Sequence, residues 1–223
     1  MARLSRLVLP GQAHYVIQRG HNGQPVFADD ADRATYEALL RETAAAQQVL
    51  LHAWALPATE VQLLATPPDA AALSRMMQAL GRRYVSTHNR RHGRSGTLWD
   101  GRFRCAVVEP GAAVLEVLRL VDGLATDGAP SSAAHRSGGR RDPALVDPPA
   151  YWQLGNTPFE REAAYRRLLD TPLPTARAQA LRRAALGGWA VGTVAFAAQA
   201  AAAAGRPALP RAPGRPRRIS QRA

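Results

Sequence analysis

The first 127 residues alternate between two kinds of apolar periodicity, and this alternation limits the fold more than any other feature of the chain. The period of two that is typical of strands occupies residues 14–19, 49–56, 61–65 and 102–108. Helical spacing of apolar side chains occupies residues 30–46, 70–91 and 111–121. The order strand, helix, strand, strand, helix, strand, helix predicts an α+β fold, with a ferredoxin-like antiparallel sheet backed by helices.

The helix expected over residues 70–91 combines an apolar stripe with a basic C-terminal end. The stripe recurs at i, i+3, i+4, i+7 and i+11, through Leu73, Met76, Met77, Leu80 and Tyr84. Asp29 and Asp30 offer N-caps for the helix expected over residues 30–46.

Composition shifts divide the chain into four expected parts. Residues 1–127 form the α+β domain, and residues 128–150, rich in Ser, Gly, Pro and Arg, form a linker or long loop. Residues 151–205 form a helical region, with helices expected near 158–169, 175–185 and 189–204. Residues 206–223 form an Arg/Pro-rich tail that is disordered until it meets a partner.

The positive charge is concentrated in two segments. The net charge is +12, and every one of the 29 basic residues is arginine, so position rather than residue type carries the argument. Residues 81–104 hold seven arginines against one acid, Asp100, and residues 206–222 hold six arginines and no acid. The arginines of the first segment are Arg82, Arg83, Arg90, Arg91, Arg94, Arg102 and Arg104. Aromatic side chains and two histidines lie between them: Tyr84, His88, His92, Trp99 and Phe103. Such a surface favours nucleic acid over a membrane as the partner.

Several other classes of protein are disfavoured. A lone Cys105 excludes internal disulfides and a cysteine-based zinc site, and we expect a buried thiol. The apolar run near the N-terminus is too short for a signal peptide. The uncharged stretch 184–205 is mostly alanine and glycine, which insert poorly into a bilayer. We therefore expect a cytoplasmic protein that does not span a membrane.

Several segments together resemble the REP-associated tyrosine transposases, in the single-tyrosine branch of the HUH nucleases. The resemblance rests on order and spacing over nearly the whole chain. Its N-terminal landmarks are Pro10-Gly11, His14-Tyr15-Val16 and Arg19-Gly20. The central block runs from Asn89 to Arg94 and from Leu98 to Phe103, and the C-terminal landmarks are Ser131-Ser132, 187–192 and 214–218.

The resemblance implies a metal site that this chain has altered. The family carries two histidines one residue apart on a central strand, where they bind a divalent metal that polarises the scissile phosphate. The matching positions are Glu60 and Gln62. Their oxygens suit Mg²⁺ or Mn²⁺, so a weakened metal site is one interpretation. The other is a pair of polar residues on a half-exposed strand, with no cofactor.

The resemblance also implies a nucleophilic tyrosine, followed in the family by Asn-Pro. In this chain the position of the tyrosine holds Leu120, and the positions of Asn-Pro hold Leu124-Ala125. A leucine cannot attack phosphorus. Tyr84 is the fallback nucleophile, although a role in the core or in base stacking is favoured for it. His88 and His92, at i and i+4, have a spacing that can bind metal, but among arginines we expect contacts with phosphate or solvent.

The main hypothesis is a DNA-binding protein of transposase ancestry with lost or severely impaired strand cleavage and joining. It would bind hairpin or single-stranded DNA through Arg19 and the seven arginines of residues 81–104. Arg215, Arg217 and Arg218 lie in a tail that resembles an AT-hook core, and they would add a clamp in the minor groove. The alternatives are an active metal-dependent transposase using Glu60, Gln62 and Tyr84, and a decaying product with neither activity. Relatives include monomers and dimers, so a homodimer stays open.

Overall fold

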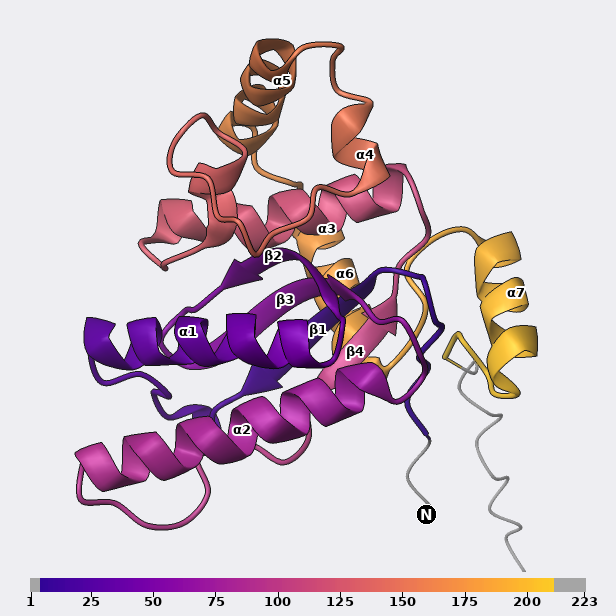
Figure 1. Ribbon diagram of the computed structural model, residues 1–223. Helices are drawn as coiled ribbons and strands as arrows, with labels where there is room; N and C mark the ends of the chain where they lie inside the picture. Colours follow the sequence, from indigo (N-terminus) through magenta and orange to yellow (C-terminus); the bar gives the residue numbers. More distant parts are fainter. Residues whose placement is uncertain (1–4, 211–223) are drawn as a thin grey trace, which may run out of the picture.

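The computed structural model describes residues 5–210, except for the side chains of Thr126 and Asp127. Its centre is an antiparallel sheet of four strands in the order β2-β3-β1-β4 (Figure 1). The strands are β1 (His14–Arg19), β2 (Leu50–Ala55), β3 (Glu60–Thr66) and β4 (Arg104–Val107). The α+β class and the antiparallel sheet backed by helices are confirmed.

Seven α-helices lie within the described residues. They are α1 (Asp30–Ala46), α2 (Ala72–Arg91), α3 (Ala112–Gly123), α4 (Pro149–Trp152), α5 (Pro158–Asp170), α6 (Thr175–Gly187) and α7 (Val194–Ala204). The N-cap predicted before α1 is present, because the Asp29 side chain accepts a hydrogen bond from Asp32 N. The four-residue helix α4 is too short for a periodic signal, so the sequence did not predict it.

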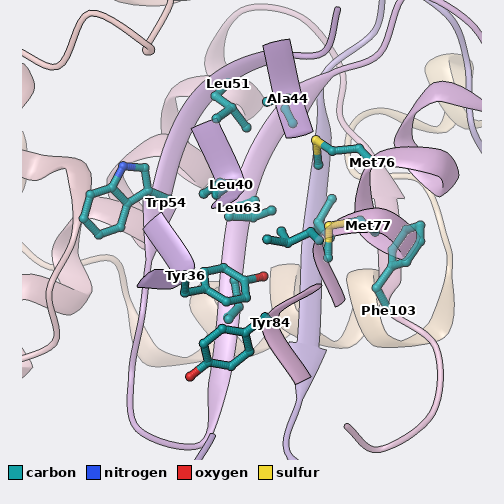
Figure 2. Close-up of a cluster of buried hydrophobic side chains, with 14 of the residues drawn as sticks. Tyr36, Leu40, Ala44, Leu51, Trp54, Leu63, Met76, Met77, Tyr84 and Phe103 are labelled. Carbon is teal, nitrogen blue, oxygen red and sulfur yellow. The ribbon is translucent and has the colours of Figure 1, made fainter. Parts of the chain in front are cut away.

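Helices α1 and α2 cover one face of the sheet (Figure 1). Figure 2 shows this core, in which Tyr36 and Leu40 from α1 meet Met76, Met77 and Tyr84 from α2. Sheet residues of the same cluster include Val16, Trp54, Leu63 and Cys105. Cys105 is buried, as predicted for a structural thiol.

Helices α3 and α6 pack on the opposite face, and α6 is visible behind the strands in Figure 1. The strand residues Tyr15, Ile17 and Leu64 point into this second cluster, where they meet Val117 of α3 and Leu181 of α6. Because side chains alternate along a strand, Glu60 and Gln62 lie on this face with Leu64. Both faces of the sheet are therefore covered.

The loop between α3 and α4 lies against β2. Trp54 N donates a hydrogen bond to Ser132 Oγ at 2.9 Å, and Leu56 N donates to Pro130 O at 2.9 Å. Arg136 is fully buried, with its Nε 2.7 Å from Asp147 Oδ1 and its Nη1 3.6 Å from Asp122 Oδ2. Composition predicted the loop but not this buried arginine, because one of its partners, Asp122, lies outside the loop on α3. The fourfold division of the chain stays an expectation.

The last helix starts later than the sequence predicted. We expected it to begin near residue 189, but residues 189–192 continue past β4 instead. Val191 N donates to Val107 O and Glu109 N donates to Val191 O, each at 2.8 Å. Gly192 then turns the chain at a φ of 149°, and Thr193 caps α7. None of the helices in the described part of the chain has the length and apolar character needed to cross a membrane.

Candidate nucleic-acid interface

A groove of about 670 Å³ runs between the middle of α2 and the segment that precedes β4. Arg82 and Ser86 line it from α2, and Arg102 and Phe103 line it from the other side, with Arg6 from the N-terminal segment. The basic end of α2 and the start of β4 were both predicted to be cationic. The fold places Arg82 of α2 and Arg102 on opposite walls of this hollow, whereas Arg90 and Arg91 at the end of α2 do not line it.

Two smaller hollows extend this groove. The first, of about 190 Å³, shares Arg6, Arg102 and Phe103 with it and adds Arg104 and Arg206. The second, of about 370 Å³, shares Arg82 and Ser86 with it and adds Arg83 and Arg90. We call these three adjoining hollows the arginine groove, and define it by Arg6, Arg82, Arg83, Arg90, Arg102, Arg104 and Arg206.

Three of the arginines predicted to bind DNA form ion pairs with carboxylates of the protein, although the sequence suggested only one acid near them. Asp100 was the only acid expected among them, and it pairs with Arg19 at 2.9 Å. Helix α1 supplies further acids: Glu42 binds Arg83 at 2.8 Å with both carboxylate oxygens, and Asp29 binds Arg91 at 2.7 Å. These acids lie about 40 to 60 positions away from their partners in sequence, so local charge counting missed them.

The other five predicted arginines are exposed and form no ion pair with any residue of 5–210. They are Arg82, Arg90, Arg94, Arg102 and Arg104. All but Arg94 belong to the arginine groove. Exposed guanidinium groups without a protein carboxylate are the groups that can bind phosphate oxygens. Arg215, Arg217 and Arg218 of the predicted clamp lie outside the described residues.

Sequence reasoning missed Arg6 as a member of this surface. Its guanidinium carbon lies 3.8 Å from the centre of the Phe103 ring, and its Nε donates to Phe103 O at 3.3 Å. Arg206 was counted only in the tail, yet it donates to Gly188 O at 2.8 Å and is nearly buried. No local pattern signals either contact, because the partners are about 100 and 18 residues away.

The aromatic residues between the arginines mostly serve the core. Tyr84 is fully buried, and its ring lies edge-on to Tyr36 at 5.0 Å between centroids. Trp99 and Phe103 border the groove but are only 6% and 5% exposed. Of the aromatic side chains expected between the arginines, only the exposed edges of Trp99 and Phe103 can therefore contact a base in the groove.

Glu60 and Gln62 form a closed network with Tyr15 and Arg182. Tyr15 Oη donates to Gln62 Oε1 at 2.5 Å, and Gln62 Nε2 donates to Glu60 Oε1 at 2.6 Å. Arg182 of α6 donates one nitrogen to Glu60 Oε1 at 2.5 Å and the other to Glu60 Oε2. Glu60 is 7% and Gln62 3% exposed, so both are buried rather than half-exposed.

This network does not fit a divalent metal. Both carboxylate oxygens of Glu60 bind a guanidinium, and the amide oxygen of Gln62 accepts the Tyr15 hydroxyl. A metal would have to compete with a fixed cation for the same oxygens. Burial raises the pKa of Tyr15, so its hydroxyl stays protonated and remains a donor.

The two positions considered for a nucleophile lie on opposite faces of the sheet, and neither offers an exposed hydroxyl. Leu120 lies on α3 and packs against the second-face cluster, beside Leu124, Leu169 and Leu173. Tyr84 lies on the other side of the sheet, where its hydroxyl donates to Val26 O at 2.6 Å. Burial is the main reason that its pKa is raised, which disfavours the phenolate that attack would need.

His88 does not contact solvent as we expected, whereas His92 is partly exposed. His88 is 4% exposed, and the rings of both histidines point toward the Asp32 carboxylate at the start of α1. The residues expected from the sequence thus separate into three places: the arginine groove, the Glu60 network and this histidine cluster.

No protein-family model matches the chain, and no curated protein matches it. Two solved structures are similar to part of it. A REP-associated tyrosine transposase bound to a REP hairpin superimposes with a TM-score of 0.47 and 11% identity, over 57% of this chain and 75% of that one. A protein assigned as a transposase in Deinococcus radiodurans R1 gives a TM-score of 0.38 and 20% identity, over 48% of this chain and 87% of that one.

Proposed function

We propose that this protein binds structured single-stranded DNA, such as a palindromic hairpin, and that its strand cleavage and joining are lost or severely impaired. The observation that carries the proposal is the arginine groove, whose three adjoining hollows share lining arginines. Arg82 and Arg102 stand on its two walls without a protein carboxylate among residues 5–210, and Arg6 lies between the larger hollow and its neighbour. A phosphate backbone is the common polyanion that such a row of cations fits.

The hollow shape of the groove suits a single DNA strand or the end of a hairpin better than the side of a DNA duplex. The groove is hollow, and it is bordered by Trp99 and Phe103 as well as arginines. An unstacked base and its phosphate need both kinds of side chain, because the base requires an aromatic or apolar neighbour and the phosphate requires a cation. The tail arginines Arg215, Arg217 and Arg218 would add a second, electrostatic contact.

Impaired chemistry follows from the positions that the resemblance assigns to catalysis. Arg182 occupies the Glu60 oxygens that a metal would need. Leu120 supplies no nucleophile, and Tyr84 is buried on the far side of the sheet from Glu60. The active-enzyme alternative therefore has neither a free metal ligand nor an accessible hydroxyl among the residues proposed for it.

One incubation tests both halves of this proposal. The full chain is mixed with a labelled DNA hairpin carrying a single-stranded end and with Mn²⁺, then divided between a native gel and a denaturing gel. We expect a shifted complex on the native gel and no covalent adduct on the denaturing gel. The matched control is Tyr84→Phe, which we expect to behave like the wild type on both gels.

Two outcomes would contradict the proposal. An adduct in the wild type that disappears in Tyr84→Phe would establish the active-enzyme alternative. Absence of the shifted complex would remove the DNA-binding half and leave a chain with neither activity.

A further inference from the structure

Three metal-ligating side chains converge where the first turn of α1 meets the last turn of α2. Asp32 comes from α1, and His88 and His92 come from one face of α2 at i and i+4. One ligand atom from each lies within 4.8 Å of the other two. His92 Nε2 is 3.0 Å and His88 Nε2 is 3.5 Å from Asp32 Oδ2, and the two rings are 4.5 Å apart.

Neither ring nitrogen of His88 has a normal hydrogen-bond partner among the described residues. Its side chain is 4% exposed, and its Nδ1 has no hydrogen-bond partner in the described part of the chain. Its Nε2 approaches Asp32 Oδ2 only at 3.5 Å, which is beyond a normal hydrogen bond. Because no protein group of residues 5–210 lies within normal hydrogen-bond distance of Nε2, this nitrogen is free to bind an ion.

We infer that Asp32, His88 and His92 bind a divalent transition-metal ion. A tetrahedral Zn²⁺ with bonds of about 2.0 to 2.2 Å holds its ligand atoms about 3.4 Å apart, close to the separations of 3.0 and 3.5 Å in this cluster. Two imidazoles and one carboxylate suit zinc or its first-row neighbours. Three protein ligands leave the fourth position for water.

The surroundings of the cluster fit such an ion. Arg91 donates to Asp32 Oδ1 at 2.6 Å and Ala28 N donates to Asp32 Oδ2 at 2.9 Å, so the carboxylate is held in place from outside. Arg91 also binds Asp29 through both carboxylate oxygens. Arg91 therefore holds both carboxylates, and Asp32 Oδ2 faces the two histidines.

The partial exposure of His92 also fits a bound ion. His92 is 24% exposed, so solvent can partner its Nδ1 when Nε2 binds the ion.

The ion would join the start of α1 to the end of α2, beside the basic loop that follows Arg91. This site is distinct from Glu60 and Gln62, which lie on the opposite face of the sheet. Its role is structural: it fixes the helix end that presents Arg90 to the arginine groove. The inference does not depend on the proposed DNA-binding function.

The test uses the full chain, without an affinity tag and after treatment with a chelator. Titration with Co²⁺ is followed by its visible absorption, and Zn²⁺ is then added in competition. We expect about one ion per chain, Co²⁺ absorption in the tetrahedral range, displacement by Zn²⁺, and a rise in Tm with either ion. In His92→Gln the affinity should fall about tenfold or more, while in His21→Gln, at an exposed histidine outside the cluster, it should not change.

A measurement on the unmutated protein keeps the inference testable if His92→Gln folds poorly. Zn²⁺ should shift the imidazole NMR signals of His88 and His92 together and leave those of His21 in place. Absence of stoichiometric binding, equal affinity in His92→Gln and the wild type, or shifts confined to other histidines would each overturn the metal site.

Discussion

At the scale of single residues, His14 shows how a buried titratable group links stability to pH. It is the first residue of β1 and is fully buried. Its Nδ1 lies 2.8 Å from Gln12 O, and its Nε2 accepts a hydrogen bond from Leu9 N at 3.2 Å. Both bonds are satisfied when the ring is neutral with its proton on Nδ1. Burial lowers the pKa of His14 to about 4, against the opposing effect of the Gln12 carbonyl.

This pKa shift predicts a loss of stability in weak acid. Between about pH 6.5 and pH 4 the unfolded chain binds a proton at His14 that the folded chain does not, so the free energy of unfolding falls as pH falls. His14 alone contributes up to about 3 kcal/mol across this window. His14→Gln cannot take up the proton, so its urea-unfolding free energy should depend less steeply on pH than that of the wild type. Equal slopes in the two proteins would contradict the assignment.

At the scale of elements, the buried guanidinium of Arg136 holds the loop between α3 and α4 in place. Arg136 lies between Asp147 and Asp122, and Asp122 also accepts hydrogen bonds from Ser132 Oγ and Tyr165 Oη. The loop, α3 and α5 therefore share one polar cluster inside the second-face core. Removing one partner of a buried ion pair leaves an uncompensated charge, which costs more than the pair contributes.

Arg136→Leu should therefore lower the free energy of unfolding by about 3 to 5 kcal/mol in urea titrations. The matched control is Arg140→Leu, an exposed arginine of the same loop, which should change stability by about 0.5 kcal/mol or less. A small effect at Arg136, similar to the control, would mean that the loop is not anchored through this side chain.

The elements also show what the sequence could and could not predict. The four strands and the three helices of the N-terminal 127 residues follow from their apolar patterns. Each of these helices buries one face against the sheet, whereas the strands are buried on both faces. The partners of Arg91, Arg136 and Glu60 could not be predicted, because each pairing joins segments that only the tertiary fold brings together. The resemblance identified Glu60, Gln62 and Leu120 as altered positions. It did not show that Arg182 from α6 would bind the carboxylate of Glu60.

At the scale of the whole molecule, the net charge of +12 is distributed unevenly over the fold. Helix α1 and its N-cap neutralise Arg83 and Arg91, whereas Arg82, Arg90, Arg102 and Arg104 are exposed along the adjoining hollows of the arginine groove. The two hydrophobic clusters that flank the sheet hold the walls of this groove in place. The account as a whole depends on whether this groove binds phosphates.

The most direct measurement is the salt dependence of hairpin affinity, by fluorescence anisotropy, in the wild type and two matched double variants. Six phosphate contacts on a single strand predict a slope of about −4 for log K against log salt. Arg82→Ala/Arg102→Ala should weaken binding and make the slope shallower by about 1.4. Arg166→Ala/Arg167→Ala removes the same charge from the exposed surface of α5 and should leave the slope unchanged. A wild-type slope near zero, or equal losses in both variants, would contradict the arginine groove as the DNA site.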